Sequence, residues 1–231
     1  RELDNSEPVE LRTMKTNEQQ RRAIWKALEY TPTPEQERIH LADLKNPDLL
    51  IKQVVGGEQA GKSYLSAKEI MSRFIEGNLY WFAGETFELC RKEFEYLLED
   101  AYKLGVLMPD YSFPKEGPCQ AEIARGAIKR GNRTQIEKAV IKTKSLGDPL
   151  KIAMESPDGI VICEAAQTSW GNVERCRTRV AAAHGWLLLQ GTMEGSLGYY
   201  AEKFNEWQAP NPEKAQSFSL PSWTNTIRYP L

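Results

Sequence analysis

The chain has 231 residues, of which 41% are hydrophobic and 27% are charged, so it reads as one large globular domain or two small ones. The 30 basic and 32 acidic residues nearly cancel, which argues against a chain coated with nucleic acid but permits a local basic patch. The 4 cysteines form no CxxC pair, only 2 histidines occur, and no apolar run approaches the ~20 residues of a membrane span, so neither structural zinc nor a membrane is expected.

Two helices are expected before the first strand. Residues 1–16 are expected to form an irregular arm, and the apolar residues of 17–30 recur at helical spacing behind Asn17, a favourable N-cap. The TPTP sequence at 31–34 ends this helix, and Pro34 can open a second helix over 34–44. We expect residues 1–30 to be an N-terminal arm and helix, followed by the main domain over residues 31–231.

From residue 49 onward, strand and helix segments alternate. The expected strands lie at 49–55, 78–84, 159–163 and 186–190, the expected helices at 62–76, 86–105, 171–183 and 197–207, and an extended segment at 215–223. Residues 120–145 alternate polar and apolar side chains around a turn at Arg130, Gly131 and Asn132, which favours a hairpin. This order predicts an α/β fold with a mostly parallel sheet and helices on both faces.

The strongest motif is GGEQAGKS at 56–63, which matches the GxxxxGK[ST] phosphate loop between an expected strand and an expected helix. Its glycines let backbone N–H groups point into one concavity, and the positive end of the following helix adds to that field. Lys62 would reach the phosphates of ATP, and the Ser63 hydroxyl would bind Mg²⁺. A chance match in a glycine-rich turn is the alternative, which the flanking strand and helix disfavour. The residues expected to bind nucleotide here are Gly56, Gly57, Glu58, Gln59, Ala60, Gly61, Lys62 and Ser63.

A second strand, GIVIC at 159–163, leads directly to Glu164. A carboxylate at this position can orient or deprotonate the water that attacks ATP, although a solvated glutamate at a helix entry is the alternative. The preceding residue, Cys163, is a thiol and therefore a poor ligand for Mg²⁺. Asp158 cannot replace it, because it lies about 17 Å upstream at the rise of a strand. We therefore expect Ser63, the phosphates and water to hold Mg²⁺, with Glu164 outside its direct coordination sphere.

In their order, these motifs resemble the ATPase domain of the large terminase subunit, the DNA-packaging motor of tailed bacteriophages, which is a P-loop NTPase. The resemblance covers about residues 30–230. It rests on PEQ at 34–36, VVGGEQAGKS at 54–63, LYWFAGETFELCRKEFEYL at 79–97, GIVICEAAQ at 159–167, LLLQGT at 187–192 and PSWTNTIRYP at 221–230.

The resemblance implies ATP and Mg²⁺ as cofactors, with coupling of ATP hydrolysis to translocation of double-stranded DNA. By resemblance, Gln36 would contact adenine, for which an amide that donates and accepts is suited, and Gln190, Gly191 and Thr192 would couple loss of the γ-phosphate to movement. An exposed helix glutamine and a plain strand-to-turn junction are the alternatives. The partners implied are the portal and the small terminase subunit. We expect a ring when assembled, a weakly active or inactive monomer when isolated, a location in the host cell cytoplasm, and no nuclease domain.

Terminases commonly use an arginine in the phosphate loop and an arginine finger from a neighbouring subunit. No arginine lies in this loop, and the position before the acidic strand holds Lys151. For each of the other candidates, a solvated surface position is the favoured alternative. These candidates are Arg125, Arg130, Arg133, Arg177 and Arg179.

Residues 125–144 are rich in lysine and arginine, with only Glu137 opposing them. Arg130 and Arg133 are our candidates for contact with the DNA backbone, which a motor must grip without reading bases. A basic, solvated hairpin is the alternative. Two other functions stay open: a small-molecule kinase that uses residues 125–133 as a lid, and a nucleotide-gated assembly module without turnover, which Cys163 motivates.

Overall fold

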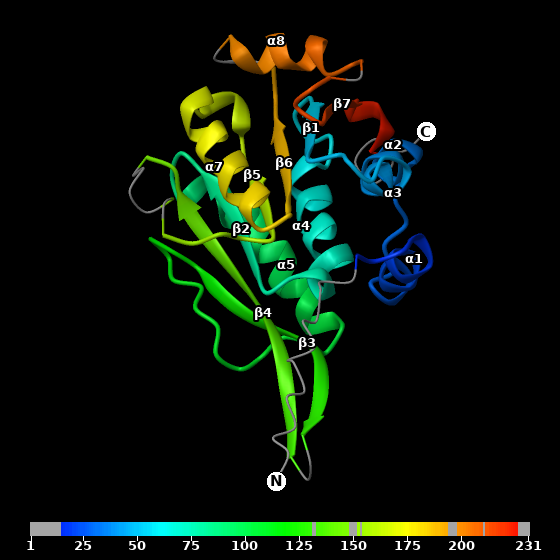
Figure 1. Cartoon of the computed structure of the whole chain (residues 1–231), viewed down its shortest axis with the longest axis vertical. Helices are drawn as coiled ribbons and strands as arrows, with labels where there is room; N and C mark the ends of the chain where they lie inside the picture. Colours follow the sequence, from blue (N-terminus) through cyan, green and yellow to red (C-terminus); the bar gives the residue numbers. More distant parts are fainter. Residues whose placement is uncertain are drawn as a thin grey trace, which may run out of the picture.

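The computed structural model describes residues 15–130, 133–147, 152, 154–193, 198–209 and 211–225. The strands are β1 (Ile51–Gly56), β2 (Leu79–Gly84), β3 (Gln120–Arg130), β4 (Arg133–Ser145), β5 (Gly159–Ile162), β6 (Trp186–Gly191) and β7 (Ala215–Leu220). They form a seven-stranded sheet in the order β3-β4-β2-β5-β6-β1-β7 (Figure 1). All neighbouring strands are parallel except β3 and β4, which form an antiparallel hairpin. The predicted mostly parallel sheet is therefore confirmed.

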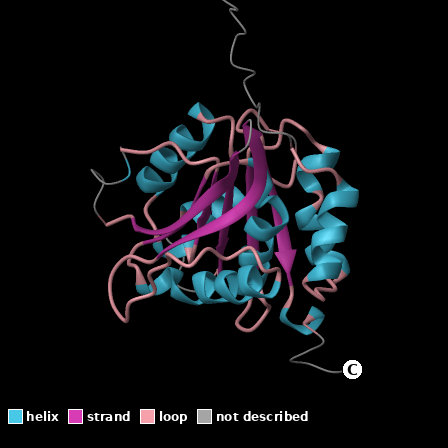
Figure 2. Cartoon of the chain, turned by 90° about the horizontal axis from the view of Figure 1, so that it is seen from below, coloured by secondary structure: helices cyan, strands magenta, loops and turns pink. Residues whose placement is uncertain are grey.

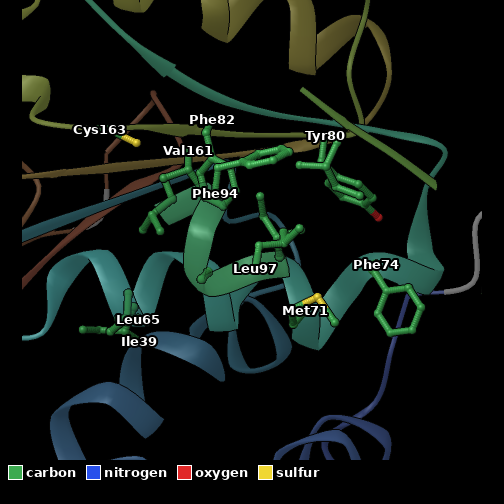
Figure 3. Packing of buried hydrophobic residues seen from close by; sticks show 14 of the residues in the cluster. Ile39, Leu65, Met71, Phe74, Tyr80, Phe82, Phe94, Leu97, Val161 and Cys163 are labelled. Carbon is green, nitrogen blue, oxygen red and sulfur yellow. The ribbon is translucent and has the colours of Figure 1, made fainter. Parts of the chain in front are cut away.

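Helices cover both faces of this sheet (Figure 2). The helices are α1 (Glu18–Ala27), α2 (Pro34–His40), α3 (Ala42–Lys45), α4 (Lys62–Arg73), α5 (Arg91–Lys103), α7 (Trp170–Ala182) and α8 (Tyr199–Glu206). On one face, Phe82 of β2 and Val161 of β5 belong to the same buried cluster as Phe94 of α5 (Figure 3). On the other face, Val173 of α7 and Tyr200 of α8 belong to a second cluster. In the part of the chain that is described, no helix has both the length and the apolar character needed to cross a bilayer.

Several expected elements have other bounds in the structure, including the following two. The helix expected over 34–44 is interrupted at Leu41, because the carbonyl of His40 accepts a hydrogen bond from the buried Arg21 guanidinium. The N–H of Leu44 then bonds to the carbonyl of Leu41 at 3.2 Å. The segment expected to be extended over 215–223 is a strand only as far as Leu220, and a short 3-10 turn follows.

A buried network of charged side chains ties α1 and α3 to the sheet. Arg21 of α1 pairs with Asp43 of α3, with 2.6 Å between Nη2 and Oδ2. Nζ of Lys52 in β1 lies 2.7 Å from Oδ1 of Asp43 and 2.8 Å from Oε1 of Glu69 in α4. Burial acts to raise the pKa of Asp43, but Lys52, Arg73 and Arg21 outweigh it and hold that pKa well below its usual range. Because Arg21 also donates to the carbonyl of His40, the network holds α2 as well as α3. The first turn of α2 lies at the functional site.

Replacing Asp43 by alanine is expected to lower the free energy of unfolding by about 3–5 kcal/mol, because it leaves Arg21 and Lys52 buried without their carboxylate. Urea unfolding at neutral pH measures this. A folded-state pKa below the unfolded value gives stability above about pH 4 that is lost as the pH falls, so the difference from the unmodified protein should shrink in acid. Asp48→Ala is the matched control, because the Asp48 side chain is 82% exposed. A loss at Asp43 no larger than at Asp48 would contradict the assigned role of the network.

Candidate functional site

The carboxyl ends of three parallel strands meet at one edge of the sheet. β6 lies between β5 and β1, with Ile162 opposite Leu189 and Val55 opposite Gly191. The segments that follow these strands therefore lie side by side, although they are far apart in the sequence. They border an open cavity of about 1190 Å³.

Most of the residues predicted for nucleotide binding and catalysis line this cavity. Gly56 and Gly57 instead precede the lining part of the loop, and Gln190 and Gly191 are buried at the end of β6. The predicted residues that line the cavity are Gln36, Glu58, Gln59, Ala60, Gly61, Lys62, Ser63, Glu164 and Thr192.

The phosphate loop has the backbone that its glycines predict. Gly61 has φ +87°, a left-handed conformation that glycine adopts without strain. A Cβ on Gly56 would lie 2.6 Å from the carbonyl oxygen of Leu220, so no side chain fits there. α4 starts directly after Gly61 and has no side-chain cap, which leaves its first N–H groups free of side-chain partners at the cavity. This end of α4 is an anion-binding position.

The Lys62 side chain folds back over the loop. Nζ donates to the carbonyl oxygens of Gly56 at 3.1 Å and Gly57 at 2.8 Å. Burial lowers the pKa of Lys62, and the nearby carboxylates of Glu164, Glu58 and Glu93 oppose this effect. The ammonium group is thus held at the phosphate loop by weak neutral acceptors, which phosphate oxygens can replace.

Glu164 follows the end of β5 and lines the cavity with Lys62. Its backbone is left-handed, with φ 48° and ψ 51°, a strained conformation for a residue with a side chain. Such strain persists only where the surrounding structure enforces it and is common at functional sites. The fold thus directs a carboxylate into the cavity beside the phosphate loop.

The first turn of α2 forms another wall of the cavity. Gln36 completes a capping box with Thr33, and its Oε1 accepts from the Thr33 N–H at 2.9 Å. Its Nε2 faces Gly61, where an added Cβ would lie 3.5 Å away. The capping bond uses one of the two lone pairs of Oε1, so the amide can still donate through Nε2 and accept through Oε1, and contact with adenine stays a prediction.

Several lining residues were missed by sequence reasoning. Tyr30, Tyr64 and Tyr96 form an aromatic wall, with ring centroids of successive neighbours 5.6 and 5.4 Å apart. Tyr64 could have been found, since it directly follows Ser63. Tyr30 follows α1 and Tyr96 lies in the middle of α5, and no local pattern marks either residue.

A small polar cluster lies buried beneath the phosphate loop. Glu93 of α5 is 2% exposed, and its Oε1 accepts from Nε2 of Gln190 at 2.9 Å. Burial raises the pKa of Glu93, while the Ser63 hydroxyl and the Cys163 thiol act in the opposite direction. Burial, together with Cys90 and Glu93, raises the pKa of Cys163 well above its usual value. Position 163 therefore carries a neutral thiol, which lies in the same apolar cluster as Val161 (Figure 3).

The segment after β7 is bound to the phosphate loop. Ser222 Oγ donates to the carbonyl of Glu58 at 2.9 Å, and Asn225 Nδ2 donates to the carbonyl of Gln59 at 2.7 Å. A change in the conformation of the phosphate loop would therefore act directly on residues 222–225, which follow β7. Residues 226–230 of the expected 221–230 motif lie outside the described residues.

The solved structures similar to this chain include the ATPase domain of one phage large terminase and the large terminase of another phage. The ATPase domain of the Thermus phage P74-26 large terminase superimposes with a TM-score of 0.70 at 16% identity, over 94% of this chain and 91% of that one. The large terminase of another thermophilic bacteriophage, in complex with ADP, gives 0.61 at 13% identity, over 84% of this chain and 46% of that one. This chain has the fold of a large terminase ATPase domain. Neither a family model nor a curated protein matches the sequence.

The described arginines that were considered as a finger do not lie at the cavity. No arginine among the described residues lines the cavity. Arg125 lies 3.7 Å from Glu137, and Arg177 pairs with Glu174 at 3.0 Å. Lys151 lies outside the described residues, as does the side chain of Arg130.

Ion pairs neutralise several of the basic side chains in residues 125–144, so this segment carries less positive charge than its own sequence suggests. Lys142 and Lys144 both pair with Glu155, at 2.6 and 2.8 Å, and Lys138 pairs with Glu122 at 2.6 Å. These two glutamates lie outside the 125–144 segment, which is why its composition did not reveal them. Arg133 is exposed and makes no ion pair with another described residue.

The donor set suits a cation that arrives with phosphates rather than one held by protein alone. Within the described residues, no group of three or more His, Cys, Asp or Glu side chains could enclose a metal. The Ser63 hydroxyl lines the cavity, and the buried carboxylate of Glu93 lies beside it. A hydroxyl and a carboxylate are oxygen donors of the kind that Mg²⁺ prefers.

Proposed function

We propose that this chain is the motor domain of a viral DNA-packaging terminase, which hydrolyses ATP and couples hydrolysis to movement of double-stranded DNA. The cavity where the phosphate loop, Glu164 and Thr192 meet, within the terminase ATPase fold, carries the proposal. Two structures of the second phage's terminase are complexes with ADP and with ATP-gamma-S, which supports a nucleotide as the ligand. Such a protein acts in the host cell cytoplasm, as a ring with the portal and the small terminase subunit, and is a monomer when isolated.

In this proposal the residues of the chain supply positioning and charge. The N–H groups at the start of α4 and the Lys62 ammonium bind the phosphates, with phosphate oxygens replacing the carbonyls that Lys62 now contacts. Glu164 orients the attacking water and accepts its proton. Mg²⁺, when bound, neutralises charge that develops on the phosphates, and the Ser63 hydroxyl is placed to hold it. Thr192 lines the same cavity and is the residue proposed to sense the γ-phosphate.

A kinase would require cationic residues closing over the phosphates. Arg125, in the segment considered as a lid, donates to the carbonyl of Ile75 and lies near Glu137, away from the cavity lining. This favours hydrolysis over phosphoryl transfer to a small molecule. Incubation with ATP and a panel of nucleosides and nucleotides separates the two, because a hydrolase releases inorganic phosphate at the same rate with or without each acceptor. Phosphorylated acceptor would overturn the proposal.

Replacing Lys62 by alanine is expected to weaken ATP binding by about 10- to 150-fold, because charged hydrogen bonds contribute about 1.5–3 kcal/mol each. Isothermal titration with a non-hydrolysable ATP analogue measures the affinity. Lys115→Ala, which removes an exposed lysine, is the matched control and should bind like the unmodified chain. Equal affinity of the Lys62 variant, or no binding by the unmodified chain, would count against the proposed function.

Replacing Gln36 by glutamate tests contact with adenine separately from helix capping. Glutamate retains the oxygen that caps Thr33 but loses the Nε2 donor, so α2 should persist. The added negative charge lies near the phosphate loop and also weakens the binding of free triphosphate, which lacks a base. The affinity for ATP should therefore fall about tenfold more than that for triphosphate, or about 1.4 kcal/mol. If both affinities fall by the same factor, Gln36 acts on the loop and not on the base.

We also propose that the β3–β4 hairpin contacts double-stranded DNA through Arg130 and Arg133. Arg133 is exposed and has no ion pair among the described residues, which supports this, and a contact limited to phosphates suits a motor that moves along any sequence. Binding should weaken with rising salt and be the same for unrelated DNA sequences.

A further inference from the structure

The proposed cation site lacks a carboxylate at the end of β5, where the sequence has Cys163. Ser63 offers a hydroxyl, but Cys163 is a buried thiol, and sulfur is a soft donor that Mg²⁺ does not prefer. Asp158 lies at the opposite end of β5, where its Oδ2 accepts from the N–H groups of Asn78 and Leu79 at 2.7 and 3.0 Å. No carboxylate of β5 itself can therefore take this place.

A carboxylate from a different element lies at that position. Glu93 of α5 is close enough to Ser63 and Cys163 for both side chains to act on its charge. Its Oε1 is bonded to Gln190, whereas Oε2 is buried and makes no hydrogen bond of ordinary length and angle with a described residue, although the Ser63 hydroxyl and the Cys163 thiol lie near the carboxyl and act to lower its pKa. A buried polar atom left without a partner is costly, so such an atom beside a cation-binding hydroxyl points to an absent ligand.

We propose that Glu93 supplies the carboxylate of the magnesium site that β5 lacks at Cys163. The inference rests on the proposed function, because the cation arrives with the nucleotide. Oε2 receives Mg²⁺ or one of its water molecules beside Ser63, and the bond from Gln190 to Oε1 holds the carboxylate in orientation. The same bond joins the magnesium site to the end of β6, one residue before Gly191 and two before Thr192.

The test measures nucleotide affinity with and without magnesium. Titration of ADP and of a non-hydrolysable ATP analogue is performed in excess Mg²⁺ and in excess chelator, for the unmodified chain, Glu93→Gln, and the double variant Glu93→Gln with Cys163→Asp. The part of the affinity that depends on Mg²⁺ should fall at least about 10-fold in Glu93→Gln, because losing even a group that only supports a metal ligand usually costs about 10- to 100-fold. Affinity in chelator should stay within about twofold, and the double variant should regain the magnesium effect.

Direct observation of the metal gives a second readout. Mn²⁺ bound with ADP is detected by electron paramagnetic resonance, and its affinity should follow the same order among the variants. Glu99→Gln, at an exposed position on the same helix, is the matched control and should behave like the unmodified chain. Circular dichroism melting verifies that each variant is folded.

The outcomes separate this inference from the function on which it rests. If Glu93→Gln retains the full magnesium effect, the inference is wrong while the proposed function stands. An equal loss with and without Mg²⁺ assigns Glu93 a structural role and also overturns the inference. If the unmodified chain binds no nucleotide in either condition, both the proposed function and the inference fail.

Discussion

ATP turnover per subunit should rise about 10³-fold or more when dilute chains are brought to a concentration at which they associate, because an arginine supplied by a neighbour contributes about 10³–10⁵ in comparable NTPases. The cations that line the cavity are Lys62 and Lys92, and no described arginine does so. Glu29, Glu58 and Glu164 add negative charge to the same cavity. A single subunit therefore has little with which to stabilise the negative charge of the transition state.

The measurement is phosphate release per subunit over a range of protein concentrations, with association followed by light scattering. Turnover should rise in step with association. A specific activity that is high in dilute protein and independent of dilution would refute a finger supplied between subunits.

A mixing experiment isolates what the neighbour supplies. Chains with Lys62→Ala bind ATP poorly but keep every arginine, so adding them to dilute unmodified chains should stimulate turnover by the unmodified ones. Substituting candidate arginines in the added chains, one at a time, then identifies the finger as the substitution that abolishes stimulation. Stimulation by none of the added chains would show that the neighbour supplies no catalytic group.

Replacing Glu164 by glutamine should reduce ATP turnover about 10²- to 10⁴-fold while ATP remains bound, because the amide preserves size but accepts no proton. Affinity should be unchanged or slightly higher, since a negative charge next to the phosphates is removed. Single-turnover phosphate release measures the chemical step, and titration of ATP measures binding.

The control for Glu164 is Glu202→Gln, an exposed position on α8. Turnover of that variant should equal that of the unmodified chain. If Glu164→Gln hydrolyses ATP at the normal rate in the associated state, the general base is another residue. If it fails to bind ATP, Glu164 contributes to the architecture of the cavity and not to the proton transfer.

Local features of the site could be predicted because their causes are local. The glycines at 56 and 61 are required by backbone geometry within a few residues, and Lys62 and Ser63 follow from the same motif. The strand that ends before Glu164 is an apolar run that only a buried strand explains. The charge of the basic segment at 125–144 could not be predicted from that segment alone, because Glu122 and Glu155, which pair with its lysines, lie outside it in the sequence.

The burial of Glu93 could not be predicted from the sequence pattern. In the sequence it is one glutamate among several on an amphipathic helix, where a solvated position is the ordinary expectation. Its burial beside Ser63, Cys163 and Gln190 depends on how α5 packs against the sheet. The same holds for Tyr30 and Tyr96, which reach the cavity only because α1 and α5 pack near α4.

The sequence alone therefore determined the α/β order of elements, the phosphate loop and the placement of Glu164 after a buried strand, since each depends on neighbouring residues and on side-chain period. Only the tertiary structure decided which side chains from distant segments meet beneath the loop and which lysines are neutralised by glutamates. These contacts depend on strand order and helix packing. Both are set by packing energies summed over the whole core, so no short stretch of sequence determines them. The burial of a single carboxylate such as Glu93 therefore leaves no local pattern in the sequence.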